Sequence, residues 1–108
     1  MRLRQAAVTA VGVLALVMSA PNPASASTGD FLYKVGPGVQ AGLADPESGT
    51  CINLFGATEE NAAFAPQNFT DATATVFLDF DCEGDVFYVM NPGKKFGDRL
   101  KLRSVIFS

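Results

Sequence analysis

Four acidic side chains recur at every second position in the last third of the sequence: Asp79, Asp81, Glu83 and Asp85. Alternate residues of a strand share one face, so Asp79 and Asp81 would lie side by side there. Two neighbouring carboxylates are the groups that glycoside hydrolysis requires. We interpret them instead as the solvated face of a strand, since acidic residues are mostly exposed and a chain this short has little room for a cleft.

The sequence contains no histidine. Activation of a serine or cysteine nucleophile by histidine is therefore excluded. Zinc also lacks an ordinary ligand set, because there is neither a histidine nor a C-x-x-C pair. We expect a protein that is not an enzyme and that carries no cofactor and no metal.

Cys51 and Cys82 are the two cysteines of the chain. Two cysteines in a small exported domain ordinarily form a disulfide. Closing a loop of roughly 32 residues would stabilise the fold by about 3.7 kcal/mol, a large share of the stability of a small domain. We therefore predict a Cys51–Cys82 disulfide.

The first 26 residues have the three parts of a secretory signal peptide. Arg2 and Arg4 give a basic start, residues 6–18 are uncharged and apolar, and Ala24-Ser25-Ala26 ends the segment with a cleavage pattern. A membrane span needs about 20 apolar residues, more than this run provides. The sequence thus predicts a bacterial signal peptide over residues 1–26 and one secreted domain over residues 27–108.

The predicted domain is acidic. Without Arg2 and Arg4 the eight basic side chains fall to six, against eleven acidic ones, for a net charge of −5. Nucleic acids and anionic membranes attract basic surfaces, so neither is expected as a partner once the signal is removed. We expect a monomer.

Alternation of polar and apolar residues predicts strands throughout the domain. The longest alternating run covers residues 76–82, with Gly84 in a hairpin turn before a second strand at 86–90. A further strand is predicted at 100–106, and upstream strands are predicted at 31–35, 39–43 and 50–55. A turn is predicted at Pro66-Gln67-Asn68. No sustained helical periodicity is present, and the fold class is therefore all-β.

Phe77 is a large apolar residue on the polar side of the alternating run. The spacing Phe77-x4-Cys82-x-Gly84, with Ser104 in a later strand, resembles the Greek-key signature of the βγ-crystallins. Cys82 stands where that family has a second aromatic residue. The resemblance implies a small Greek-key β-sandwich, here with one disulfide, in which the hairpin around Gly84 covers Phe77 and Ser104 closes the hairpin.

Many microbial βγ-crystallins bind calcium through two Asn or Asp residues and a hydroxyl pair. In the motif that ends on Ser104, Arg99 and Leu100 occupy the acidic positions and Arg103 a hydroxyl position. Guanidinium groups repel a cation that needs oxygen ligands. We predict no tight calcium site at Ser104, and calcium binding by the Asp79–Asp85 acids is left open.

The resemblance is strongest to small secreted bacterial members, such as the metalloproteinase inhibitors and the killer-toxin-like proteins. It implies a non-enzymatic domain that binds an extracellular protein such as a protease. The loops Gly56 to Asn61 and Asn91 to Asp98 would supply the contact surface. The alternative is a structural or cell-envelope-associated extracellular protein without inhibitory activity.

Overall fold

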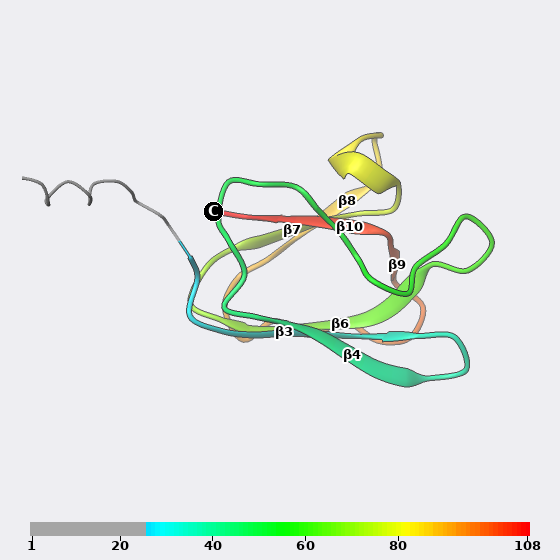
Figure 1. Ribbon diagram of the computed structural model, residues 1–108, viewed down its shortest axis with the longest axis horizontal. Helices are drawn as coiled ribbons and strands as arrows, with labels where there is room; N and C mark the ends of the chain where they lie inside the picture. The colour runs from blue at the N-terminus through cyan, green and yellow to red at the C-terminus, as the bar shows by residue number, and fades with distance from the viewer. Residues whose placement is uncertain (1–25) are drawn as a thin grey trace, which may run out of the picture.

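The computed structural model describes residues 26–108, in which all regular structure is strand apart from one short 3₁₀ turn. The strands are β3 (Gly29–Val35), β4 (Val39–Ala44), β5 (Ile52–Asn53), β6 (Ala63–Thr70), β7 (Ala74–Phe77), β8 (Phe87–Met90), β9 (Lys101–Leu102) and β10 (Ser104–Phe107). They form two antiparallel sheets that face each other (Figure 1). The all-β prediction is confirmed. The predicted signal peptide lies outside the described residues except for Ala26.

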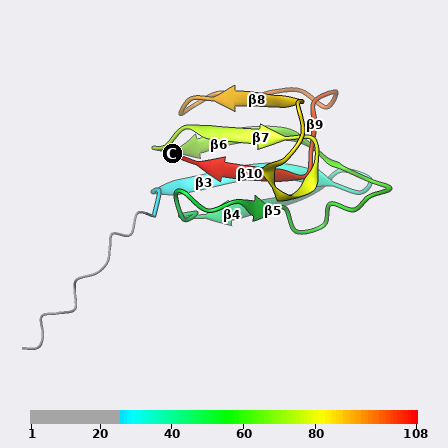
Figure 2. The same cartoon turned by 90° about the horizontal axis from the view of Figure 1, so that it is seen from above.

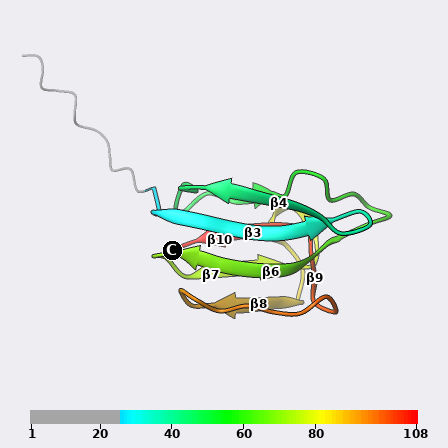
Figure 3. The same cartoon turned by 90° about the horizontal axis from the view of Figure 1, so that it is seen from below.

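The two sheets have the strand orders β4-β3-β6-β9 and β5-β10-β7-β8. Strands β3 to β6 and strands β7 to β10 therefore follow the same route. In each set the first two strands pair with each other, the fourth lies beside the first, and the third joins the opposite sheet (Figures 2 and 3). Each set of four strands thus supplies the other sheet with an edge strand.

The core lies between the two sheets. Phe31 and Tyr33 point inward from β3, and Val105 and Phe107 point inward from β10, in the alternation that strands impose. The rings of Phe31 and Phe107 meet edge to face across the core, with centroids 5.4 Å apart. Burial of each such side chain is worth roughly 1.5–3 kcal/mol, so these contacts fix the spacing of the sheets.

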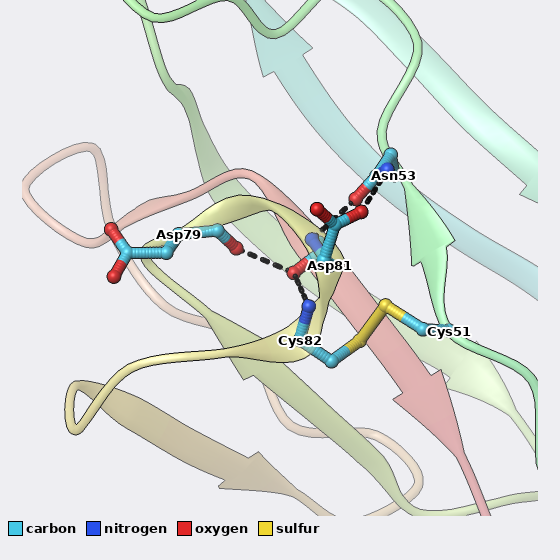
Figure 4. Close-up of a disulfide and its surroundings, with 6 residues drawn as sticks. Cys51, Asn53, Asp79, Asp81 and Cys82 are labelled. Carbon is cyan, nitrogen blue, oxygen red and sulfur yellow. Dashed lines mark hydrogen bonds between the residues drawn. A yellow bond between two sulfur atoms is a disulfide. The ribbon is translucent and has the colours of Figure 1, made fainter.

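The strand predicted over residues 76–82 is shorter than the alternation indicates. Strand β7 ends at Phe77, and Phe80–Cys82 is a 3₁₀ turn in which Asp81 and Cys82 have φ of 63° and 54°. Two successive left-handed residues turn the chain out of the sheet, and such a conformation persists where its surroundings hold it. Residues 78–86 consequently form a folded hairpin between β7 and β8 (Figure 4).

The turn predicted at Pro66-Gln67-Asn68 is absent, because β6 runs without a break from Ala63 to Thr70. The strand instead contains an irregularity, with a register shift opposite β3 and Ala65 at a φ of 54°. Proline is tolerated at such bulges. Asn68 is fully buried, and its amide donates to the carbonyl oxygens of Ala72 and Met90. Asn68 thus joins β6 to the end of β8 rather than forming a turn.

Candidate protein-binding loop

The predicted Cys51–Cys82 disulfide is confirmed, with the two Cα atoms 5.9 Å apart (Figure 4). It joins the residue before β5 to the end of the 3₁₀ turn in the folded hairpin. Because Cys51 belongs to the first set of strands and Cys82 to the second, the bond links the two sets. It also fixes the start of the segment that leads from β5 to the exposed loop described below.

Ser104 lies under the folded hairpin and is fully buried. Its hydroxyl accepts a hydrogen bond from the Cys82 amide at 2.9 Å and donates one to the Asp79 carbonyl at 2.6 Å (Figure 4). The predicted contact between Ser104 and the hairpin backbone is confirmed by these two bonds. One side chain of β10 thereby satisfies two backbone groups of a segment that has left the sheet.

Asn53 of β5 holds the same hairpin from its other side. The Asp81 amide donates to Asn53 Oδ1 at 2.8 Å, and Asn53 Nδ2 donates to Asp81 Oδ1 at 3.0 Å. Asn53 could not be predicted as a site residue, since no local sequence pattern pairs it with a residue 28 positions away. The pair explains how Asp81 is held in a left-handed conformation.

The acidic residues of the hairpin do not converge. The Asp79 carboxylate points away from Asp81 in Figure 4, and the Asp81 carboxylate faces the amide of Asn53. Within residues 26–108 there is no group of three or more histidine, cysteine or acidic side chains arranged to hold a metal ion. Asp81 and the Asp79 carbonyl instead bond within the fold, to Asn53 and to Ser104.

Phe77 is partly buried and packs against Phe87 of β8, with ring centroids 5.8 Å apart. Gly84 has a φ of 90°, as expected for a glycine in the turn. A Cβ at Gly84 would collide with the carboxylate of Asp79. The close neighbour of Gly84 is thus Asp79, whereas the sequence analysis expected the ring of Phe77.

A tight turn follows β5 at residues 54–57. The Ala57 amide donates to the Leu54 carbonyl at 3.2 Å, and Gly56 has the positive φ that the third position of a type II turn requires. Phe55 occupies the second position, and 85% of its surface is exposed. Phe55 was predicted to end a strand over residues 50–55, although Gly56 directly after it could have indicated a turn. The structure presents this ring to solvent beside a buried Leu54.

The Phe55 turn is held from inside the core. The hydroxyl of Tyr33, which is otherwise buried, donates to the Phe55 carbonyl at 3.1 Å. Burial raises the pKa of the Tyr33 hydroxyl, because the ionised form would lose its solvation. Gly56 packs so closely on Val35 that an added Cβ would lie 3.1 Å from that side chain. Both contacts restrict the backbone that carries the exposed ring.

Arg103 holds the rest of the loop. Its guanidinium donates from Nε to the Thr58 carbonyl and from Nη2 to the Glu59 carbonyl, both at 2.8 Å. A third bond runs from Nη1 to the Leu78 carbonyl at 3.1 Å. Arginine suits this position because its planar fork can bind two acceptors at once. Arg103 thus ties the loop to the folded hairpin.

The loop tip closes on itself and borders a cavity of about 350 Å³. Thr58 and Asn61 bond reciprocally, with the Asn61 amide 2.9 Å from Thr58 Oγ1 and the Thr58 amide 2.8 Å from the Asn61 carbonyl. The cavity is lined by Gly36, Glu60, Asn61, Ala62, Phe64, Leu78, Lys101 and Arg103. Residues 54–62, which we call the Phe55 loop, therefore form a preorganised surface that carries an exposed ring at its start and borders a cavity at its tip.

The second predicted contact loop, Asn91 to Asp98, is attached to the edge of β6. The Gly93 amide donates to the Asn68 carbonyl and the Phe96 amide to the Pro66 carbonyl. The ammonium group of Lys94 lies 5.0 Å from the centre of the Phe96 ring. This loop carries its aromatic ring partly buried, so the Phe55 loop is the better candidate for a contact surface.

No protein-family model, curated protein or solved structure matches this chain. Over residues 26–108, no helix has the length and apolar character to cross a membrane. The geometry of the Phe55 loop is therefore the basis on which a function is proposed.

Proposed function

We propose that this chain is an exported, non-enzymatic domain that binds an extracellular peptidase through the Phe55 loop. The observation that carries the proposal is the exposure of a large aromatic ring on a backbone held by internal hydrogen bonds. An exposed phenylalanine is unfavourable in water, and its transfer to an apolar pocket of a partner would gain roughly 1.5–3 kcal/mol. Aromatic anchors of this kind dominate the energetics of protein interfaces.

The rigidity of the loop supports a binding role. Ordering a flexible loop on association costs affinity, whereas a loop already held in place avoids that cost. Tyr33, Arg103 and the Thr58–Asn61 pair each fix a different part of the Phe55 loop. The nearby Cys51–Cys82 disulfide fixes its origin.

The acidic charge of the Phe55 loop restricts the kind of partner protein that would bind it. Glu59 and Glu60 are exposed on the loop that carries Phe55. A complementary partner would combine an apolar pocket for the ring with a basic rim. Peptidases that cleave beside large aromatic residues have such a pocket in their substrate site, which makes them the class to test first.

The strand order supports the βγ-crystallin resemblance. A Greek key places the fourth strand beside the first in the order 4-1-2-3. Both β6 beside β3 and β10 beside β7 follow this rule, with the third strand of each set transferred to the other sheet. We propose a βγ-crystallin-like pair of Greek keys, and the relation to the secreted inhibitors and toxin-like proteins is part of that proposal.

Export is the remaining part of the proposal. The apolar run at residues 6–18 and the Ala24-Ser25-Ala26 pattern favour cleavage by a signal peptidase. A disulfide persists in the oxidising environment outside the cytoplasm. Mass spectrometry of protein from the culture medium of a bacterial host should give a chain that begins at Ser27.

Inhibition assays test the proposed function. The protein is titrated against purified extracellular serine and metallo-endopeptidases that cleave beside aromatic residues, and the inhibition constant is measured. Phe55→Ala should weaken inhibition roughly 30-fold, as expected for loss of an anchor worth about 2 kcal/mol. Because the ring is exposed, this variant should unfold at the same denaturant concentration as the parent.

Phe69→Ala is the matched control, since Phe69 is also an exposed phenylalanine but lies on β6 away from the loop. It should leave inhibition unchanged. Absence of inhibition across both peptidase classes, with the protein recovered from the cell-wall fraction, would favour the structural alternative and reject the proposal.

A further inference from the structure

We propose that the free edge of β8 binds the β8 edge of a second copy of this chain, which joins two β5-β10-β7-β8 sheets into one. This surface is separate from the Phe55 loop. Strand β8 lies at one edge of its sheet and β5, which leads into the Phe55 loop, lies at the other (Figure 2). A dimer formed through β8 would therefore leave both Phe55 loops accessible.

The backbone of β8 is available for pairing. Strand β8 pairs with β7 in the register Thr75↔Val89 and Phe77↔Phe87. The Leu78 amide donates to the Val86 carbonyl, so the alternation of an antiparallel ladder turns the backbone groups of Phe87 and Val89 away from β7. No strand of the described chain pairs with that outer side. The strand thus presents unpaired donors and acceptors.

The side chains of β8 lack the features that normally protect an edge. Edge strands are commonly blocked by charged residues, proline or bulges. Residues 86–89 are all apolar or aromatic, and Phe87 and Val89 are 51% and 54% exposed. The ring of Phe77 extends the same apolar surface from β7 onto the outer face of the sheet. Side chains of a strand added alongside β8 would pack against Phe87 and Val89 as cross-strand neighbours.

The charges flanking β8 favour a second copy as the occupant. Asp85 precedes the strand, and Lys94 closes the turn that follows it, where its amide donates to the Asn91 carbonyl. In an antiparallel pair of β8 strands centred on Tyr88, Asp85 of each copy would lie opposite Asn91 of the other and therefore close to its Lys94. A two-fold interface is self-complementary in this way by symmetry. The charges that flank β8 are therefore complementary to the charges that flank a second, antiparallel β8 strand.

The outward groups restrict the register, because residues that exchange hydrogen bonds must face each other. The register that places both outward residues of each copy at the centre of the interface sets Phe87 of one copy opposite Val89 of the other. The two-fold axis then passes beside Tyr88, and the two Tyr88 residues form a directly opposed pair. Side chains in such a non-hydrogen-bonded pair are close enough to be joined by a disulfide if both are replaced by cysteine.

Strand β4, at the edge of the other sheet, is a second candidate for pairing with another chain. It also lacks charged residues, but it contributes Ala41, Gly42 and Ala44 where β8 has large side chains. Its capacity to bury apolar area against a second strand is therefore smaller. This proposal replaces the monomer expected from the sequence.

Sedimentation velocity of the protein with its disulfide intact should show a dimer that dissociates on dilution. Val89→Pro removes an outward N–H without removing a bond to β7, and Val89→Lys places a charge on the edge. Both should shift the protein to a monomer while Phe55→Ala stays dimeric. If Val89→Pro fails to fold, Val89→Lys still tests the interface, because lysine retains the backbone N–H that proline removes. A monomer at all concentrations, or a dimer that both folded variants retain, overturns the proposal.

Cysteine cross-linking tests the register. Tyr88→Cys should form a covalent dimer under mild oxidation, and Gln40→Cys on the β4 edge is the control that should not. Cross-linking by Gln40→Cys in preference to Tyr88→Cys would assign the interface to β4 and contradict the proposal. Asp85→Lys should weaken the dimer, and adding Lys94→Glu should restore it. Inhibition assays are independent of these results, since Phe55 lies outside the interface.

Discussion

The hydroxyl of Ser104 lies 2.9 Å from the backbone nitrogen of Cys82, and through this contact a core strand holds a hairpin that has left its sheet. Cys82 is at the same time the residue bonded to Cys51. The hairpin is therefore fixed at one residue both by a covalent bond to the start of β5 and by a hydrogen bond to β10.

Replacement of Ser104 by alanine should destabilise the fold by about 1–3 kcal/mol. The Cys82 amide and the Asp79 carbonyl would both lose a partner in a partly buried position, and an unsatisfied backbone group carries this cost. Urea denaturation measures the loss. Ser108→Ala, at an exposed position, should leave the transition unchanged; equal midpoints for the two variants would contradict the role of the Ser104 hydroxyl.

Removal of the disulfide by Cys51→Ala with Cys82→Ala should lower the unfolding free energy by about 3.7 kcal/mol, the value expected for closing a loop of roughly 32 residues. Hydrogen exchange should show the largest increase in the 78–86 hairpin, because Cys82 is its anchor. An unfolding free energy equal to that of the oxidised parent would show that the hairpin is held by its hydrogen bonds alone.

Gly84→Ala should destabilise the protein by roughly 1–3 kcal/mol, the cost of a strained backbone conformation. Its φ of 90° disfavours a side chain, and the new Cβ would displace the Asp79 carboxylate. Gly97→Ala is the control, because a Cβ there meets no atom within 4 Å and its φ lies outside the left-handed region. Thermal unfolding of both variants measures the difference, and equal melting temperatures would rule out strain at Gly84.

Arg103→Lys should loosen the Phe55 loop. Lysine retains the charge but cannot bond the Thr58 and Glu59 carbonyls together with that of Leu78. We expect faster hydrogen exchange at residues 58–61 and a loss of about 1–2 kcal/mol in stability, because bonds to a charged donor are among the stronger ones. Lys101→Arg is the charge-preserving control. Unchanged exchange in Arg103→Lys would mean that the loop is held by its own turn.

Tyr33→Phe should change how stability depends on alkaline pH. The pKa of Tyr33 is raised above 10.0 by burial, so the unfolded chain ionises this group at a lower pH than the folded chain. The folded state keeps its full stability below about pH 10 and loses it as the pH rises toward the folded pKa. The parent should therefore lose melting temperature more steeply than Tyr33→Phe between pH 9 and about 11. Parallel curves would contradict the burial effect.

The features that the sequence predicted depend on local patterns or on simple counting. Cys51 and Cys82 are the two cysteines in a chain with an export pattern, so only one disulfide within the chain was possible. The alternation of apolar residues identified β3, β7 and β10 of the core, because one buried face imposes a period of two, but it did not identify β6, where a turn was predicted. Gly84 marked the hairpin, since positive φ is a property of the residue type.

The features that the sequence did not predict depend on partners far along the chain. Alternation continues through Cys82, yet the backbone leaves the sheet after Phe77 because Asn53 and Ser104 hold it elsewhere. Arg103 reaches a carbonyl 45 positions away, and no spacing rule connects such residues. The exposure of the Phe55 ring was not predicted, since a phenylalanine at the end of residues 50–55, which contain Ile52 and Leu54, is also typical of a strand.

The exchange of third strands between the sheets has a consequence for the integrity of the chain. Residues 71–73 are the connection between the two sets of strands, and Cys51 and Cys82 lie on opposite sides of it. A peptidase that cut this connection would leave two pieces that remain covalently joined. Because β5 pairs with β10 and β9 with β6, each piece would still complete the other's sheet. The nicked protein should keep its fold. After reduction of the disulfide the two fragments would be held together only by non-covalent contacts, so their folding would depend on protein concentration.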